Sequence, residues 1–283
     1  MHLLRHFRLS FSFLLLPVFL LALATVETIR VVPALLAFLI LHGLVYPSSN
    51  AYNSLQDRDT GPIGGIEHPE AVPPVIGPLT AGVDVLAIGL SALISPLFMG
   101  CIGAYIVLSR LYSFRGVRLK KYPVLGYLTV VVSQGALVYF ATYAAISGNP
   151  AVPMHGLVVS TLLLGAFYPV TQIYQHQQDR EDHVRTISAA LGVRGTFLYC
   201  AALYGAAFLT LGDWFYTSGR LLHFGILLVL LTPVLIWFLR WALQCFRNPA
   251  VADYRHTMQM SWRAASCTNI AFFLLAILPH RFG

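Results

Sequence analysis

The sequence predicts an all-α integral membrane protein with about nine transmembrane helices in a single domain, residues 1–283. Hydrophobic residues make up 57% of the 283-residue chain and charged residues only 10%, and the mean hydropathy is +0.72. The apolar residues also form runs of about 17–24, the length at which a helix crosses a hydrocarbon core of about 30 Å. A water-soluble domain of this size needs neither feature.

The spans follow one another in order. The first comes after Arg5 and Arg8 and has no small-residue cleavage site, which predicts an uncleaved helix rather than a signal peptide. Only Ser95 and Pro96 separate the third from the fourth, and a single kinked helix over 79–112 is the alternative, leaving eight spans and both termini on one side. The expected spans are 9–26, 31–49, 79–95, 96–112, 123–146, 154–174, 194–211, 220–243 and 256–279.

The distribution of Lys and Arg predicts the orientation, because loops rich in these residues stay cytoplasmic. With nine spans, the N-terminus and both polar motifs described below are expected in the cytoplasm and the C-terminus on the opposite side. The net charge of +7 therefore reflects orientation, and no nucleic-acid partner is predicted. One side holds Arg5, Arg8, Arg58, Arg110, Arg115, Arg118, Lys120, Lys121, Arg180, Arg185, Arg194, Arg240, Arg247 and Arg255, whereas the other holds Arg30, Arg220 and Arg281.

A first polar motif, NAYNSLQDRD at 50–59, ends the second span. On a helix, Asn50, Asn53 and Asp57 fall within about 60° of one another, because successive residues are about 100° apart. Charged and amide side chains at a membrane boundary cost free energy and usually mark a site.

A second polar motif, QHQQDRED at 175–182, ends the sixth span. Gln175, Asp179 and Asp182 are expected to share a helix face there. Both motifs lie at cytoplasmic ends, so helix packing can bring them together across a polar cavity. Oxygen ligands facing one another beside Arg and Lys suit a magnesium-bound diphosphate.

With these motifs, the sequence resembles the UbiA-type intramembrane prenyltransferases. SSNAYNSLQDRDTGPIGGIEHP is similar to the NDxxDxxxD motif of that family and the loop that follows it, and YPVTQIYQHQQDREDHVRTISAALGVRG is similar to its DxxxD region. SRLYSFRGVRLKKYP resembles the basic loop after the fourth helix of the family. The resemblance covers nearly the whole chain in span order.

The resemblance implies transfer of a prenyl group from a polyprenyl diphosphate to an acceptor within the membrane, with Mg²⁺ as cofactor and membrane lipids as surroundings. It implies catalytic roles for Asp57 and Asp179. The residues expected to bind magnesium are Asn50, Asn53, Asp57, Gln175, Asp179 and Asp182. Those expected to bind the diphosphate are Arg58, Tyr112, Arg118, Lys120 and Tyr174.

The chain departs from the family pattern at three of its five acidic positions, where Asn50, Asn53 and Gln175 stand. An amide oxygen ligates magnesium without adding negative charge, so metal binding is expected to be retained but altered. Two other activities stay open. One is a related terpene cyclase, and the other is a non-catalytic isoprenoid-lipid-binding or transport protein on the same fold.

The stretch TGPIGGIEHPEAVPP at 60–74 follows the first motif directly and is rich in Gly and Pro. It cannot be a regular helix throughout. Its position predicts a lid over the diphosphate, which would exclude water from a carbocation. A plain linker is the alternative.

Overall fold

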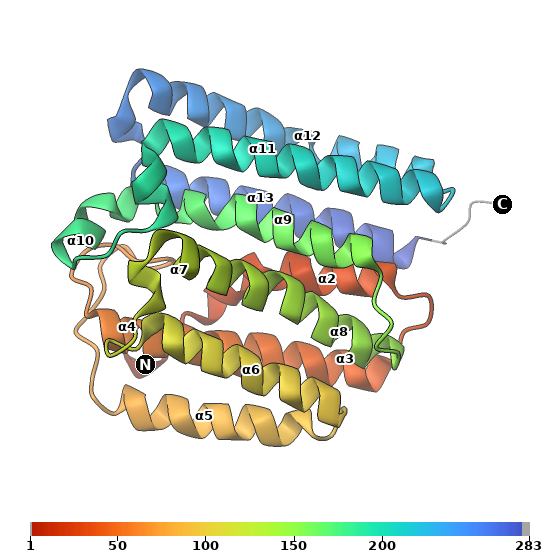
Figure 1. The fold of residues 1–283 in the computed structure, drawn as a ribbon, viewed down its shortest axis with the longest axis horizontal. Helices are drawn as coiled ribbons and strands as arrows, with labels where there is room; N and C mark the ends of the chain where they lie inside the picture. The colour runs from red at the N-terminus through yellow and green to blue at the C-terminus, as the bar shows by residue number, and fades with distance from the viewer. Residues whose placement is uncertain (1, 279–283) are drawn as a thin grey trace.

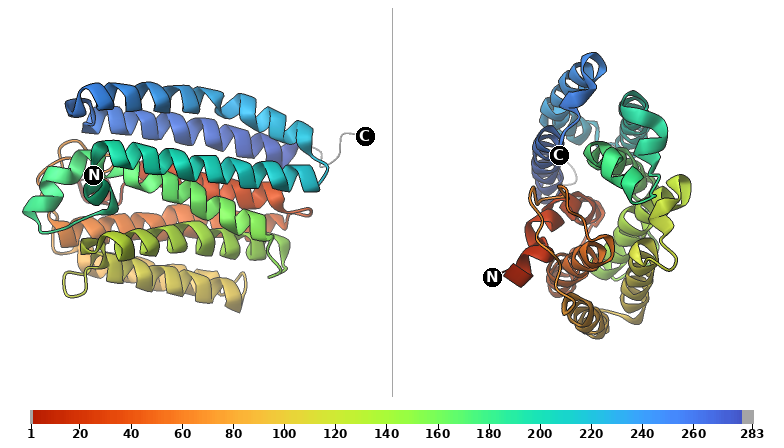
Figure 2. Two further views of the ribbon diagram at one scale, coloured as in Figure 1. Left: turned by 45° about the horizontal axis from the view of Figure 1, so that its top comes forward. Right: turned by 90° about the vertical axis from the view of Figure 1, so that its left-hand side faces the viewer.

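The structure is a computed structural model that describes residues 2–278. Within that range the chain is helical and has no named strand, only an isolated bridge between Ile63 and Ile66. The predicted all-α class is confirmed. Figures 1 and 2 show the helices running along one common direction as a bundle, with the described chain starting at one end and finishing at the other.

Eight helical segments are long and apolar enough to cross a membrane, and one shorter apolar helix, α5, has 16 residues. Counting α5, the order agrees with the prediction of about nine. Two segments contain a π-helical stretch, η2 and η4, in which the hydrogen bonds run from i to i+5. In chain order the elements are α1 (His2–His6), η1 (Leu9–Leu15), α2 (Leu16–Thr25), α3 (Val31–Phe38), η2 (Leu39–Val45), α4 (Tyr46–Asp57), α5 (Ile76–Ser91), α6 (Pro96–Ser113), η3 (Leu119–Lys121), α7 (Pro123–Val130), η4 (Val131–Leu137), α8 (Val138–Ser147), α9 (Met154–Thr171), η5 (Ile173–Gln175), α10 (His176–Glu181), α11 (Ile187–Thr217), α12 (Leu221–Arg247), η6 (Pro249–Val251) and α13 (Tyr254–Ile277).

The third and fourth spans are separate helices, so the alternative of one kinked helix is wrong. Helix α5 ends at Ser91, and Ser95 begins the next helix by accepting a hydrogen bond from the backbone N–H of Phe98 through its side chain. Pro96 then occupies the first turn of α6, where its missing N–H costs no helical hydrogen bond. The two helices form an antiparallel hairpin (Figure 1).

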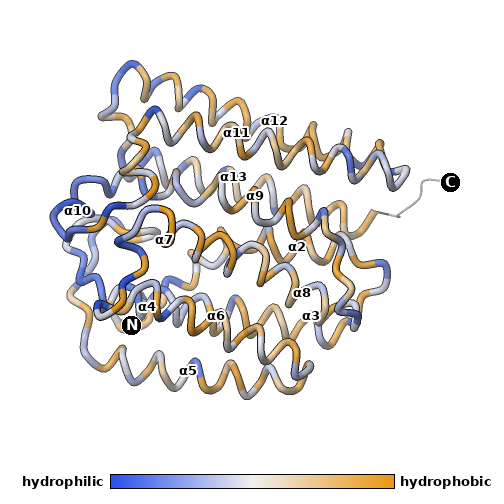
Figure 3. Tube along the Cα trace, in the orientation of Figure 1, coloured by the Kyte–Doolittle hydropathy of each residue, from blue (hydrophilic) through white to orange (hydrophobic). Residues whose placement is uncertain are grey.

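The apolar core fills the middle of the bundle, while the polar residues gather at one end. Buried side chains from α2, α3, α4, α6, α8 and α13 contribute to the larger hydrophobic cluster, with Tyr46, Tyr105 and Phe272 among its fully buried members. Hydrophilic residues concentrate where α4 ends and α10 lies (Figure 3). This distribution is that of a multi-pass membrane protein with its polar chemistry at one face.

An ion pair joins α5 to α6. Arg110 on α6 donates from Nε to Oδ2 of Asp84 on α5 at 2.9 Å. Ser48 on α4 donates to Oδ1 of Asp84 at 2.7 Å and accepts from Nη2 of Arg110 at 2.9 Å. The guanidinium also lies 4.1 Å from the ring centre of Tyr52. These contacts join α4, α5 and α6 through one polar network.

Candidate active site

A cavity of about 200 Å³ lies at the polar end of the bundle, between the end of α4 and the chain around η5 and α10. It brings together the two motifs, which are more than a hundred residues apart in the sequence. Eight of the predicted site residues line it, namely Asn50, Asn53, Asp57, Tyr112, Lys120, Tyr174, Gln175 and Asp179. Arg58, Arg118 and Asp182 are not part of the lining.

Helix α4 presents the first motif as predicted, with Asn50, Asn53 and Asp57 all in the cavity lining. The helix ends at Asp57 because Arg58 takes a left-handed conformation, with φ of 56°. Asn53 donates from Nδ2 to Oγ of Ser113 at 3.0 Å. The amide nitrogen is therefore engaged by the protein, whereas the amide oxygen accepts no hydrogen bond from the described residues.

The second motif does not form the single helix face that was expected. Helix α9 contains Pro169, which lacks the N–H needed for a helical hydrogen bond, and the chain tightens into the 3-10 turn η5 before α10 begins. Gln175 lies in η5 and Asp179 in α10, whereas Asp182 lies just beyond α10. Asp182 follows the last residue of α10, where the backbone leaves the helix, and its side chain pairs with Arg118 instead of lining the cavity.

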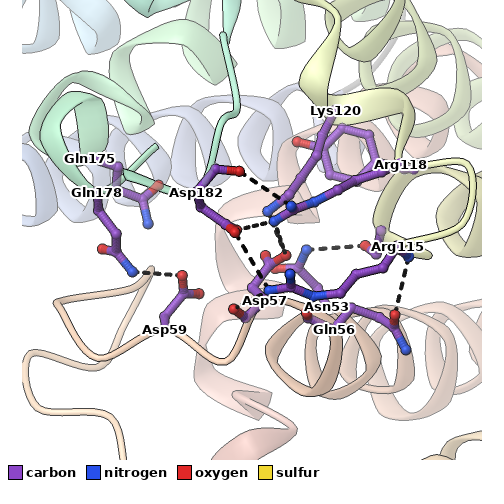
Figure 4. A network of polar contacts seen from close by, with 12 residues as sticks. Asn53, Gln56, Asp57, Asp59, Arg115, Arg118, Lys120, Gln175, Gln178 and Asp182 are labelled. Carbon is purple, nitrogen blue, oxygen red and sulfur yellow. Dashed lines mark hydrogen bonds and ion pairs between the residues drawn. The ribbon is translucent and has the colours of Figure 1, made fainter. Parts of the chain in front are cut away.

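The basic loop after α6 contributes a cation to the cavity. Nζ of Lys120 lies 2.5 Å from Oδ1 of Asp57, and Nη2 of Arg118 lies 3.6 Å from the same oxygen (Figure 4). The side chain of Asp57 is only 5% exposed. Two cations therefore contact this buried carboxylate.

Asp182 and Arg118 form a separate ion pair beside the cavity. Arg118 donates to a carboxylate oxygen of Asp182, and Nη2 of Arg115 lies 3.6 Å from the other one. Partial burial acts to raise the pKa of Asp182, but the hydrogen bond and charge of Arg118 outweigh it and hold that pKa below its ordinary value. Both oxygens of Asp182 contact arginines, so the structure does not place Asp182 with the other predicted metal ligands.

Arg58 is exposed and lies outside the cavity lining, against the prediction that it binds the diphosphate. Its left-handed backbone conformation turns the chain out of α4 and into the loop that follows. The cations that contact Asp57 are Lys120 and Arg118.

Tyrosine rings form much of the remaining lining. The hydroxyls of Tyr112 and Tyr168 are hydrogen bonded to each other, and Gln172 donates from Nε2 to the Tyr168 hydroxyl at 2.8 Å. Tyr105 also lines the cavity and accepts a hydrogen bond from Gln134 at 3.2 Å. Ring faces are favourable surroundings for a carbocation, because their quadrupole is negative above the ring.

The loop after α4 borders the cavity and is hydrogen bonded to η5 and α10. Gln178 on α10 donates from Nε2 to Oδ1 of Asp59 at 2.6 Å, and Gln175 donates to the carbonyl of Pro62 at 3.4 Å (Figure 4). Ile63 and Gly64 line the cavity directly. The loop thus occupies the place expected of a lid.

Two charged residues of the lining were not among the predicted site residues. Asp59 lies in the loop, and burial, followed by the charge of Asp57, raises its pKa to about 6. Arg8 enters from the N-terminal segment, where a left-handed turn with φ of 45° separates α1 from η1. The sequence signal for Asp59 was its place two residues after Asp57, but Arg8 looked like an ordinary cytoplasmic anchor.

Several buried polar atoms of the cavity have no hydrogen-bond partner among the described residues, including Oδ2 of Asp179 and Nδ2 of Asn50. A buried polar atom without a partner carries a desolvation cost and is a common feature of binding sites. Within residues 2–278, no three Asp, Glu, His or Cys side chains converge into a metal cage. Carboxylate and amide oxygens that require substrate phosphates to complete the coordination shell fit magnesium, which is usually bound in that way.

A larger apolar cavity of about 580 Å³ adjoins the polar one, and Leu14, Leu164 and Phe167 line both. Side chains of α2, α9, α11, α12 and α13 form its walls. Leu235 and Leu239 of α12 belong to this wall and are 57% and 48% exposed, so the cavity reaches the outer, lipid-facing surface of the bundle.

Comparison with known structures shows that this fold is shared. A UbiA homolog from Archaeoglobus fulgidus bound to DMAPP and Mg²⁺ has a TM-score of 0.72 with 16% identity, over 98% of this chain and 100% of that one. The same homolog bound to GPP and Mg²⁺ gives a TM-score of 0.71 over the same shares of the two chains, again with 16% identity.

Two curated relatives are similar in sequence. A lycopene elongase/hydratase of Haloferax volcanii is 33% identical over 135 residues, which is 46% of this chain and 42% of that protein. The match thus spans less than half of that relative. A digeranylgeranylglyceryl phosphate synthase of Methanoculleus marisnigri is 26% identical over 220 residues, 69% of this chain and 72% of the relative.

The profile of the UbiA prenyltransferase family matches residues 12–275, which is nearly the whole chain. This agrees with the helix order, with the two motifs at one end of the bundle, and with the structural neighbours. The protein is therefore a multi-pass membrane protein of the UbiA prenyltransferase family.

Proposed function

We propose that this protein transfers a prenyl group from a polyprenyl diphosphate to an acceptor inside the membrane, at the cavity between α4 and α10. The observation that carries the proposal is that Asp57 and Asp179, from two distant motifs, line one cavity together with Lys120. A structural neighbour is bound to GPP and Mg²⁺, which supports a diphosphate donor.

In the reaction, the C–O bond of the donor breaks and its electron pair leaves with the diphosphate. The acceptor then supplies the electrons for the new bond to the allylic carbon and releases a proton. Lys120 stabilises the charge that develops on the leaving diphosphate, and the rings of Tyr105, Tyr112 and Tyr168 surround the allylic cation. The loop over the cavity excludes water, which would otherwise capture that cation.

Magnesium, when bound, would neutralise diphosphate charge and assist its departure. Asp57, Asp179 and Asp59 would hold it through carboxylates, and Asn53 and Gln175 through amide oxygens. The amide nitrogens of Asn53 and Gln175 are already bonded to Ser113 and to the carbonyl of Pro62, respectively. Their oxygens are the atoms left for a cation.

The acceptor that suits this arrangement is a lipid. The apolar cavity beside the polar one reaches the lipid-facing surface along α12. The names of the two relatives, a lycopene elongase/hydratase and a digeranylgeranylglyceryl phosphate synthase, refer to lipids. We further propose that the polar end and the N-terminus face the cytoplasm, since Arg and Lys gather at that end.

Product analysis tests this proposal. The purified protein in lipid nanodiscs is incubated with isotopically labelled geranyl, farnesyl or geranylgeranyl diphosphate and magnesium, with and without a lipid extract. We expect a labelled product whose mass equals acceptor plus prenyl group, formed only with the extract. A labelled cyclic hydrocarbon or alcohol formed without the extract would instead identify a terpene cyclase.

The alternative of a non-catalytic lipid-binding protein draws on one observation, the amides at three acidic positions of the family pattern. Saturable binding of the labelled donors without any product, with or without extract, would favour it over prenyl transfer.

A further inference from the structure

The amides at Asn50, Asn53 and Gln175 remove three negative charges from the cavity relative to the family pattern, while the chain places a cation there. Arg8 lines the cavity beside Asn50 and Asp59. Each magnesium ion needs anionic ligands around it, so a site with fewer carboxylates and more cations is better suited to hold a diphosphate through its own side chains.

Arg8 is held in place by neutral acceptors rather than by a carboxylate. Nη2 donates to the backbone carbonyl of Asn50 at 3.1 Å, and Nη1 donates to the carbonyl of Gly64 at 3.2 Å. It forms no ion pair within 4 Å with any residue in the described range 2–278. Its Nε atom is buried and has no hydrogen-bond partner among the same residues. The guanidinium is therefore positioned but keeps an unsatisfied donor and an unpaired charge.

The carboxylate that would most readily neutralise Arg8 is engaged elsewhere. Asp59, the carboxylate that the loop contributes to the lining, accepts a hydrogen bond from Gln178 at 2.6 Å instead. A buried donor without a partner costs about 1–3 kcal/mol, and the Nε atom of Arg8 belongs to a side chain that lines the cavity, where an anion can accept its hydrogen bond.

Arg8 and Lys120 contact helix α4 at two places along its length. Arg8 binds the backbone of Asn50, whereas Lys120 contacts Asp57, seven residues further along α4. At 1.5 Å per residue these positions are about 10 Å apart. An anion placed between the two side chains is thus flanked by a guanidinium on one side and an ammonium on the other.

We propose that Arg8 binds the diphosphate of the donor directly, and that with Lys120 it allows the donor to bind this protein without magnesium. The inference rests on the function proposed above and concerns the same site. Magnesium then serves mainly the departure of the diphosphate rather than its capture.

Binding of a non-hydrolysable thio analogue of geranyl diphosphate, measured by calorimetry in nanodiscs with EDTA or with magnesium, tests the inference. We expect the wild-type protein to bind in EDTA, and Arg8→Gln to bind about 10- to 100-fold more weakly, as expected for loss of a charged hydrogen bond. Arg8→Lys keeps the charge but loses the guanidinium fork that the carbonyls of Asn50 and Gly64 hold, so its binding should lie between those of wild type and Arg8→Gln. Arg5→Gln is the matched control, because Arg5 is exposed and pairs with Glu70 outside the cavity.

A measurement on the wild-type chain covers the case in which Arg8→Gln does not fold. Phenylglyoxal modifies arginines, and peptide mass spectrometry reports each site. The analogue should protect Arg8 in EDTA and leave Arg5 equally reactive. Unprotected Arg8, or equal binding by Arg8→Gln and wild type, would overturn the inference and leave the proposed function standing.

Two other outcomes are also decisive. Wild-type binding that occurs only with magnesium would overturn direct capture by Arg8 and Lys120. Wild-type protein that binds no analogue in either condition would overturn the proposed function together with the inference.

Discussion

Two acidic residues of this protein, the half-buried Asp84 and the buried Asp57, are paired with cations in contrasting surroundings. Asp84 lies between α5 and α6, and both of its carboxylate oxygens accept hydrogen bonds, from Arg110 and from Ser48. Asp57 lies at the end of α4 and lines the cavity, where its Oδ1 atom contacts both Lys120 and Arg118.

The two acidic residues also differ in how many buried atoms near them lack a hydrogen-bond partner. Around Asp84 the one buried donor without a partner is Nη1 of Arg110. Around Asp57, atoms of Asp179, Asn50 and Arg8 are all buried without partners. A charge inside a membrane protein is stabilised either by a nearly closed network or by a ligand. We therefore infer that the first pair serves the fold and that the second serves binding.

The largest expected effect is on activity and separates the two pairs most clearly. Asp57→Ala is expected to lower the rate of diphosphate release at least about 1,000-fold, because a preorganised charge at the leaving group is lost. Asp179→Ala should act in the same way. Steady-state assays with each variant check this, with melting temperature in detergent showing that the protein is folded. Activity retained in both variants would remove the site assignment.

A loss of stability is expected when the other pair is broken. Asp84→Ala leaves Arg110 uncompensated inside the bundle, which costs about 3–5 kcal/mol. We expect a clearly lower melting temperature, with the activity of the folded protein within about threefold of wild type, since Asp84 does not line the cavity.

The double variant Asp84→Leu with Arg110→Met sharpens that test. Replacing a whole buried ion pair with apolar residues is often neutral or stabilising. We expect the double variant to recover most of the lost stability. A melting temperature as low as that of Asp84→Ala would show that the charges themselves, or the contacts of Arg110 with Ser48 and Tyr52, are required.

A smaller change is expected when one missing carboxylate is restored. Asn53→Asp adds a charged oxygen in the cavity, and we expect magnesium to support binding of the thio analogue at about tenfold lower concentration, since affinity follows ligand charge. Gln56→Glu is the control, because it adds charge on the same helix at a residue outside the cavity lining. Equal magnesium dependence in Asn53→Asp and wild type would show that position 53 is not a ligand.

The smallest effect is a change in the pH dependence of stability. The pKa of Asp59 rises from 3.8 to about 6 on folding, mainly through burial. The folded chain therefore holds a proton that the unfolded chain has released between these values, and stability falls as pH rises through that window. Asp59→Asn removes this loss, so its melting temperature should exceed that of wild type by an amount that grows from pH 4 to pH 6 and then stays constant. A difference that does not vary with pH would contradict the assignment.

The sequence predicted the spans and one of the two motif faces, because both depend on local periodicity. Asn50, Asn53 and Asp57 lie on a regular helix, so their spacing was sufficient to place them together. The break between α5 and α6 was also readable from Ser95 and Pro96.

The remaining residues depend on backbone irregularities and on distant contacts. Asp182 leaves the expected face because α10 ends at Glu181, and Arg8 reaches the cavity through a left-handed turn. Arg110 looked like a cytoplasmic anchor, yet it pairs with Asp84 on the neighbouring helix. Neither a change of helix type nor a contact between separate helices has a signature in residue spacing.

The central claim is that the cavity between α4 and α10 ionises a prenyl diphosphate. Its most direct test is release of diphosphate from a series of prenyl diphosphates by the purified protein, with and without magnesium, beside Asp57→Ala. We expect the wild-type protein to release diphosphate when magnesium is present, and Asp57→Ala to lose this activity. No release from any donor, despite saturable binding, would contradict it.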